Sequence, residues 1–216
     1  MMSQVLRSAA LAAVFALGAS AASAVTISFE RITSNSTIDG SNQLSLEATD
    51  DGARALLEFT AVSGLQNGLS ITEIYFSDLA GIFTPPPVIV SQSAGLSYEA
   101  GGVNTPGNVP GGMTASPAFV TTAGLVAQAN GNNATGINVG EVLVLGLNFA
   151  SGFTFDDLLA ALTSGEFRVA LHVRSLNQGE SDSFVNTPLS PIPLPAGLPL
   201  LGLGLGALAL LRRRKA

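Results

Sequence analysis

The sequence predicts a mainly β protein: a single jelly-roll-like β-sandwich with one short helix, placed between an N-terminal signal peptide and a C-terminal transmembrane helix. Apolar and polar residues alternate with a period of two in several short segments between residues 25 and 190. Turn-forming Gly, Asn and Asp separate these segments. Apolar segments with their own flanking signals lie at both ends. The predicted division is therefore 1–24, 25–190 and 191–216.

The first 24 residues have the three parts of a secretory signal peptide. Arg7 ends a short polar start, and the apolar stretch over residues 9–17 is too short to span a bilayer. Ala22 and Ala24 then form an Ala-x-Ala cleavage site. We expect export through the Sec route and a mature chain that begins at Val25. The alternative is an uncleaved N-terminal anchor.

Seven segments of the central region are predicted to be strands. Asp50, Asp51 and Gly52 separate two of them and are typical of a hairpin turn, because Asp-Gly readily adopts the positive φ that such turns need. The predicted strands cover residues 25–30, 43–48, 54–62, 69–78, 141–149, 166–175 and 181–186.

Three of these strands carry more specific expectations. The segment 141–149 is nearly all apolar, which predicts burial on both faces. Within 166–175, alternation places Arg168, His172 and Arg174 on the face opposite the core. The segment 181–186 is predicted to be an edge strand.

One helix is predicted after the strand that ends at residue 149. Thr154 is a suitable N-cap, and Asp157 three residues later completes a capping box. Asp156 and Asp157 also complement the helix dipole, and Gly165 is a suitable stop.

The middle of the chain is predicted to be irregular. Three consecutive prolines at 85–87 are expected to break the chain. Residues 101–112 and 128–136 are rich in Gly and Asn and are expected to be loops. A solvated loop and a recognition loop on a rigid scaffold are both open interpretations of these segments.

The C-terminal region combines three features in a fixed order. An extended, proline-containing motif comes first, because alternating prolines continue neither a helix nor a central strand. An apolar run of eighteen residues begins inside the motif, at Leu194, and ends at Leu211, the short limit for a membrane span. A cationic cluster then keeps the end of the chain on the cytoplasmic side and the central domain outside the inner membrane. The motif is Ile192, Pro193, Leu194, Pro195 and Ala196, and the cluster is Arg212, Arg213, Arg214 and Lys215.

This tripartite C-terminus resembles the PEP-CTERM class of sorting signals, in the VPLPA-CTERM variant with Ile192 in place of the first valine. The resemblance covers about 25 residues. It implies a Gram-negative exporter and an exosortase-like membrane enzyme that removes the tail and releases or transfers the domain. It also implies a final place on the cell surface or in the exopolysaccharide of a biofilm matrix. A permanent anchor with a proline-rich stalk is the alternative.

Charge and composition exclude several classes of function. Between residues 25 and 190, four arginines against fifteen carboxylates give a formal charge of −11. Such a domain repels nucleic acid, so no nucleic-acid partner is expected. The chain has no Cys, which excludes a disulfide framework, a thiolate metal site and a Cys nucleophile.

The central domain has few residues that could carry catalysis or bind a ligand. His172 is the only histidine, and no nucleophile motif accompanies it, so no catalytic residue and no cofactor are expected. Tyr75 and Tyr98 are the only candidates for a sugar-binding platform. The carboxylate pairs that have the composition of partial Ca²⁺ sites or, more simply, of turns and helix starts are Asp50 with Asp51, Asp156 with Asp157, and Glu180 with Asp182.

The sequence therefore favours an exported, non-enzymatic surface or matrix protein. The alternative is a secreted carbohydrate- or Ca²⁺-binding module with a permanent C-terminal anchor. Its site would lie on the loops of residues 85–140 or on the acidic turns. A glycan hydrolase is a third class, because two facing carboxylates are the requirement for that chemistry.

Overall fold

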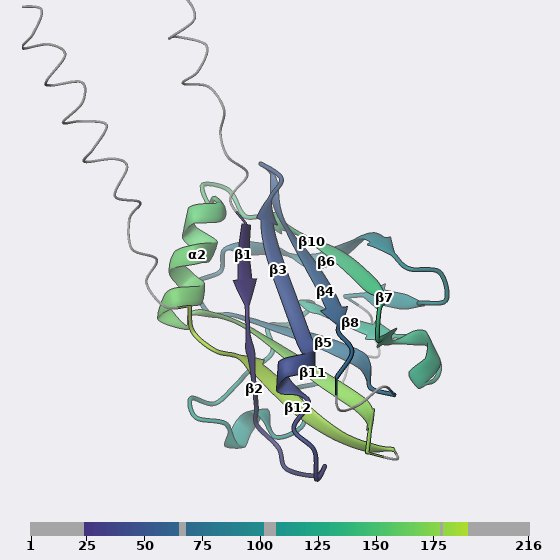
Figure 1. The fold of residues 1–216 in the computed structure, drawn as a ribbon. Helices are drawn as coiled ribbons and strands as arrows, with labels where there is room; N and C mark the ends of the chain where they lie inside the picture. Colours follow the sequence, from purple (N-terminus) through teal and green to yellow (C-terminus); the bar gives the residue numbers. More distant parts are fainter. Residues whose placement is uncertain (1–23, 65–67, 102–106, 178, 190–216) are drawn as a thin grey trace, which may run out of the picture.

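A computed structural model describes residues 24–64, 68–101, 107–177 and 179–189. Two antiparallel sheets face each other with the core between them, and the helix α2 (Phe155–Ser164) lies beside them (Figure 1). The fold is mainly β and has the arrangement of a β-sandwich, as predicted. The predicted signal peptide up to residue 23 and the predicted transmembrane segment lie outside the described residues.

All seven predicted strands are present, and others are added to them. The first sheet contains, in spatial order, β1 (Ala24–Ile27), β3 (Leu44–Asp50), β4 (Arg54–Ala61), β10 (Val142–Phe149) and β6 (Phe83–Gln92). The second sheet contains β2 (Phe29–Arg31), β12 (Glu180–Asn186), β11 (Phe167–Leu176), β5 (Ser70–Asp78), β8 (Val126–Ala129) and β7 (Tyr98–Ala100), with β9 (Ile137–Asn138) paired to β5.

The predicted first strand crosses from one sheet to the other. β1 pairs with β3 and β2 pairs with β12, and the change of sheet occurs at Ser28, which belongs to neither strand. Ile27 and Phe29 are both buried, because the sheet change leaves their side chains pointing into the shared core. One short segment thereby forms an edge of both sheets.

Two expectations about strand environment are wrong. β12 is not an edge strand, because it lies between β2 and β11. β10 is buried on one face only: Leu143, Leu145 and Leu147 point into the core, whereas Val142 and Val144 are half-buried on the outside. An apolar run in a central strand thus does not require a covering layer on its second face.

The three prolines at 85–87 do not break the chain, contrary to expectation, but lie within β6. β6 is the last strand of the first sheet, so its outer side has no neighbour to which a backbone N–H would have to donate. Thr84 pairs with Asn148 and Val88 with Gly146, so the prolines occupy an irregularity in the register. This position tolerates residues that have no N–H.

The hairpin and the helix form as predicted. Gly52 has a φ of +77° between β3 and β4, and Gly52 N donates to Asp50 Oδ1 over 2.8 Å. At the start of α2, Asp157 Oδ2 accepts from both the backbone N and the Oγ1 of Thr154, each over 2.8 Å. Gly165 ends the helix in the left-handed conformation.

The capping contact of Asp157 gives a first testable prediction. Asp157→Ala is expected to lower the free energy of unfolding by about 1 kcal/mol, because Thr154 N loses its acceptor. Asp156→Ala is the matched control, since it removes a carboxylate from the same helical turn without removing a capping bond. Its expected cost is about 0.3 kcal/mol, through the helix dipole alone. Equal losses in chemical denaturation of the two variants would contradict the capping role.

Candidate functional site

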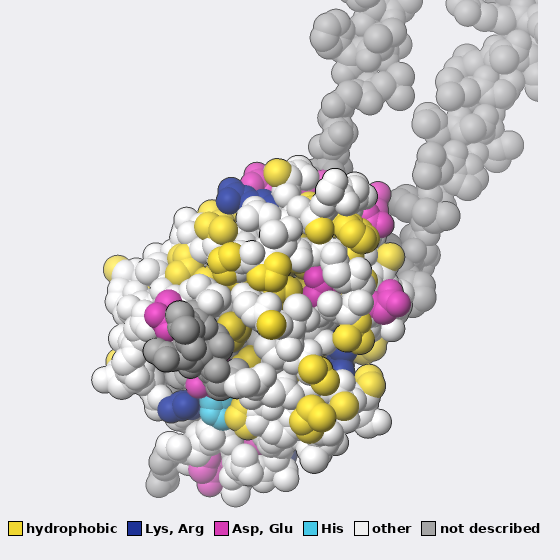
Figure 2. Space-filling view, turned by 180° about the vertical axis from the view of Figure 1, so that it is seen from behind, with side chains coloured by type: hydrophobic (Ala, Val, Ile, Leu, Met, Phe, Trp, Pro, Cys, Tyr) yellow, Lys and Arg dark blue, Asp and Glu magenta, His cyan; other side chains and the backbone are white. Residues whose placement is uncertain are grey.

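The outer face of the second sheet carries the side chains that the sequence placed there. Arg168, His172 and Arg174 of β11 share this face, as predicted from alternation. Arg168 and His172 are nevertheless only 7% and 8% exposed, so the face is not a simple solvated surface. Figure 2 views the molecule from behind and shows the histidine side chain, in cyan, beside a cationic side chain in dark blue.

One half of this face is apolar and covered by a loop. The loop 107–122 packs Val109 and Phe119 onto a second, smaller core. The sheet residues of this core are Tyr75, Val126, Ala170 and Val185. The part of the predicted 101–112 loop that is described, from Gly107 onward, is therefore packed on the sheet and is not a free solvated loop.

Arg168 fixes this loop to the sheet. Its Nη1 donates to Pro117 O over 2.9 Å and to Ala118 O over 3.1 Å, and its guanidinium carbon lies 5.5 Å from the centre of the Phe119 ring. Burial lowers the pKa of Arg168. Arg168 thus holds the loop on the apolar half of the face. The loop does not cover the rest of the face.

A row of polar side chains crosses the uncovered half, with one residue from each of five adjacent strands. Directly opposed residues of an antiparallel sheet lie side by side on one face. The row consists of Ser183, His172, Glu73, Gln128 and Glu99. His172 Nδ1 lies 3.3 Å from Ser183 Oγ, and Gln128 Nε2 donates to Glu99 Oε1 over 2.7 Å.

A β-bulge widens the row at its centre. Glu73 pairs with His172 and Ile71 with Val173, which leaves Thr72 as the extra residue of β5. Thr72 Oγ1 donates to His172 O over 3.3 Å. As a result both Thr72 and Glu73 line a pocket on this face.

This polar pocket has a volume of about 190 Å³. The strands supply Thr72, Glu73, Gln128 and Arg174, and the loop before β9 supplies Asn132 and Asn133. Of the predicted 128–136 loop, Gln128 and Ala129 are instead the end of β8, and the residues that follow form one wall of the pocket.

Hydrogen bonds hold this loop against the sheet. Ser70 Oγ donates to Asn133 O over 2.6 Å, and Asn133 Nδ2 donates to Ser175 Oγ over 2.8 Å. A Cβ added at Gly136 would lie 2.5 Å from Ile71 O, so only glycine allows the backbone to approach β5 this closely. Contacts within the protein therefore hold the wall against the sheet.

Glu73 is the central acceptor of the pocket. Tyr75 donates its hydroxyl to Glu73 Oε2 over 2.8 Å, and Arg174 Nη2 lies 3.4 Å from Glu73 Oε1. Burial, together with the charge of Glu73, raises the pKa of Tyr75 and keeps it a neutral donor. Sequence reasoning missed Glu73, because alternation alone does not show which strands become neighbours.

Neither of the two candidate tyrosines offers its ring as a sugar-binding platform. Tyr75 is fully buried and Tyr98 is 6% exposed. The Tyr98 hydroxyl donates to Ile71 O inside the core, and burial raises its pKa. Both rings complete the packing of the sheet, and their polar ends bond within the protein.

The contact between His172 and Ser183 does not have the form of a hydrolase site. Ser183 is fully buried, so its hydroxyl cannot reach a substrate. Burial lowers the pKa of His172. The charge of Glu73 is the next largest influence and opposes this shift, Arg174 adds to it, and Asp182 opposes it. The pair is a satisfied polar contact at the end of the row.

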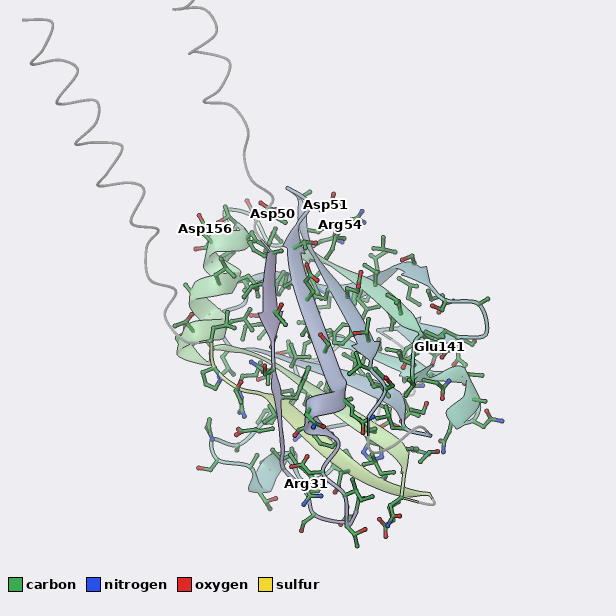
Figure 3. All side chains as sticks on the ribbon, in the orientation of Figure 1. Arg31, Asp50, Asp51, Arg54, Glu141 and Asp156 are labelled. Atoms are coloured by element: carbon green, nitrogen blue, oxygen red, sulfur yellow. The ribbon has the colours of Figure 1, made fainter. Side chains whose placement is uncertain are left out.

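The two carboxylates of the β3–β4 hairpin turn bond to neighbouring groups of the protein. Asp50 accepts from Gly52 N, and Asp51 pairs with Arg54 over 2.6 Å. Figure 3 shows these three side chains at the hairpin tip, far from Arg31 at the opposite end of the molecule. Within the part of the chain that the structure describes, no three His, Asp or Glu side chains are grouped as metal ligands.

The predicted pair Glu180 and Asp182 also binds within the protein. Glu180 Oε2 accepts from Thr37 N over 3.2 Å. Asp182 is fully buried and accepts from Asn35 N over 2.8 Å and from Ser36 N over 3.1 Å. Both carboxylates hold the loop that follows β2.

Most residues of the predicted processing sites lie outside the described residues. This applies to Ala22, to the motif 192–196 and to the cationic cluster 212–215. Ala24 and Val25 are described and form the start of β1, paired with Thr49 and Ala48 of β3. Within the described residues, no helix has the length and apolarity needed to cross a membrane.

Comparison with known proteins adds no relative: no protein-family model, no curated protein and no solved structure matches this chain.

Proposed function

We propose that this chain is an exported, non-enzymatic protein of the bacterial cell surface or exopolysaccharide matrix. A Sec signal peptide directs its export, and a C-terminal helix holds it in the inner membrane of a Gram-negative cell. An exosortase-like enzyme then removes the tail at the motif of residues 192–196. The fold in this proposal is a jelly-roll-like domain between these two signals.

The observation that carries the proposal is the order of the C-terminal features. A five-residue proline motif, an apolar run and four consecutive cations stand in this order at the end of the sequence; counted from Leu194 within the motif, the apolar run has eighteen residues, the short limit for a membrane span. An extended proline motif suits a protease groove, because a helix hides its scissile bond from the enzyme.

The contacts of the central domain support this division. Leu189 packs against the core, and Leu189 N donates to Leu162 O of α2 over 3.3 Å. The motif begins three residues later, at Ile192. At the other end, a chain that begins at Val25 loses the pair of Ala24 with Thr49 and keeps the other three pairs of β1 with β3.

A motif variant tests this proposal. Pro193→Ala combined with Pro195→Ala is expected to leave the chain at full length in the membrane fraction, because the motif no longer stays extended. Immunoblots of membrane, surface and medium fractions provide the measurement.

Pro188→Ala is the matched control, since it changes an exposed proline of the same region outside the motif. It is expected to be processed like the unmodified chain. If the double variant is shortened and released as the control is, the proposed processing motif is wrong.

The alternative function is a binding module with a permanent anchor. In that case the unmodified chain would itself remain at full length in the membrane, and the double variant would not differ from it.

A further inference from the structure

We infer that the pocket between Glu73, Arg174 and the loop 131–133 binds one ring of a neutral, hydroxyl-rich saccharide. This inference depends on the pocket alone and is independent of whether the C-terminal tail is removed.

The polar groups of the pocket match hydroxyl groups. A sugar hydroxyl both donates and accepts, so it needs acceptors and donors side by side. Glu73 supplies carboxylate oxygens, and Arg174, whose side chain is 47% exposed, supplies guanidinium N–H groups. Gln128 and Asn132 add amide groups from the two sides of the pocket.

These groups are held in place before a ligand binds. Tyr75 and Arg174 fix the two oxygens of Glu73, and Glu99 fixes the amide of Gln128. Asn132 Oδ1 accepts from Ala134 N over 2.9 Å, which puts its amide nitrogen at the free end of the side chain. These side chains therefore lose little conformational entropy when a ligand binds. This favours ligands that bind weakly through many hydrogen bonds.

Charge decides between ligand classes. Glu73 and Arg174 neutralise each other, so the pocket itself prefers neither cations nor anions. The central domain carries a formal charge of −11, from four arginines and fifteen carboxylates, and repels an anionic sugar such as a uronate. Among the described residues no three His, Asp or Glu side chains are grouped as metal ligands, so the pocket lacks a carboxylate set for a divalent cation. A neutral saccharide is the class that remains.

Size and shape limit the ligand to one ring and its affinity to a low value. The volume of about 190 Å³ is below the range of roughly 300–1,000 Å³ that drug-sized ligands occupy. Both tyrosines of the chain are buried, so none is available for a sugar ring to stack on. The expected dissociation constant is therefore in the millimolar range, as for a repeated contact along a polymer.

Saturation-transfer difference NMR tests the inference on the chain in the form purified from its host, in a zwitterionic detergent without a sugar headgroup. The probes are the methyl glycosides of glucose, galactose, mannose and N-acetylglucosamine, with glucuronate and cyclohexanol as comparisons. We expect saturation transfer to at least one neutral glycoside, and none to cyclohexanol, which has the ring but lacks the additional hydroxyls.

Variants locate the binding. Glu73→Ala and Arg174→Ala are each expected to weaken binding at least about tenfold, because each removes hydrogen bonds to a charged group. Glu58→Ala is the matched control: it removes an exposed strand glutamate from the other sheet and leaves binding unchanged. Thermal melts check that all three variants fold. If Glu73→Ala does not fold, Gln128→Leu takes its place with the same expectation.

Three results would overturn the inference. They are no transfer to any neutral glycoside, stronger transfer to glucuronate than to the neutral sugars, and transfer that survives both pocket variants. None of them bears on the tail, whose processing is measured on the chain termini.

Discussion

Asp182→Ala is expected to lower the free energy of unfolding by about 3 kcal/mol, the largest effect of any single carboxylate in the described domain. Its buried side chain accepts from Asn35 N, Ser36 N and Thr33 Oγ1, the last over 2.7 Å. It also pairs with Arg31 over 3.3 Å. Removing one partner of a buried ion pair leaves the other charge and the backbone donors unsatisfied. Urea denaturation followed by circular dichroism measures the loss.

Asp39→Asn is the control for this prediction. Asp39 lies in the same loop but is exposed, and it accepts from Ser41 N over 2.9 Å, which an asparagine can also do. Its expected cost is below about 0.5 kcal/mol. A comparable loss in both variants would mean that the loop, and not the buried carboxylate, determines the stability.

Phe76→Ala is expected to cost about 4 kcal/mol, because it opens a cavity where the two sheets meet. Phe76 is fully buried, and its ring centre lies 6.0 Å from that of Phe167 and 6.3 Å from that of Phe59. The three rings come from both sheets, so the cavity lies in the interface that holds the sandwich together.

Phe153→Ala is the matched control, since the same side-chain change is made at a position that is 37% exposed before α2. Its expected cost is below about 1 kcal/mol. The two variants can be compared in one denaturation series. A cost of Phe76→Ala no greater than that of Phe153→Ala would contradict the role of the aromatic cluster in the core.

Patterns within a few neighbouring residues correctly predicted the elements that are formed by contacts among those residues. Alternation predicted β3 and β4, because each strand has one buried and one outer face. The Asp-Gly hairpin and the capping box are likewise encoded within four residues, and both form as expected. The short strands β7 and β8 were missed, because three or four residues carry too little alternation to be recognised.

Long-range placement was not predictable from the same patterns. Whether β12 is an edge or a central strand depends on β2, which lies about 150 residues earlier in the chain. The prolines of β6 are tolerated only because the strand is at the edge of its sheet. Neither the central place of β12 nor the edge place of β6 can be predicted from the periodicity of the sequence.

Part of the candidate pocket could be predicted from the sequence. The loop 128–136 and the shared face of His172 and Arg174 were expected, since composition and alternation reveal both. Glu73 was not, because its place opposite His172 depends on a bulge at Thr72 and on the pairing of β5 with β11. The position of the loop 107–122 over the apolar half of this face could not be predicted either, because it depends on the packing of Phe119 against the sheet.

Mass spectrometry of the terminal peptides, on the chain isolated from its host, tests the central proposal most directly. Envelope and medium are analysed separately. The proposal predicts a mature chain that starts at Val25 and ends at or near Ala196, in the medium or on the cell surface. A chain that still ends at Ala216 and is found only in the membrane fraction would contradict it, and the C-terminal segment would then be a permanent anchor.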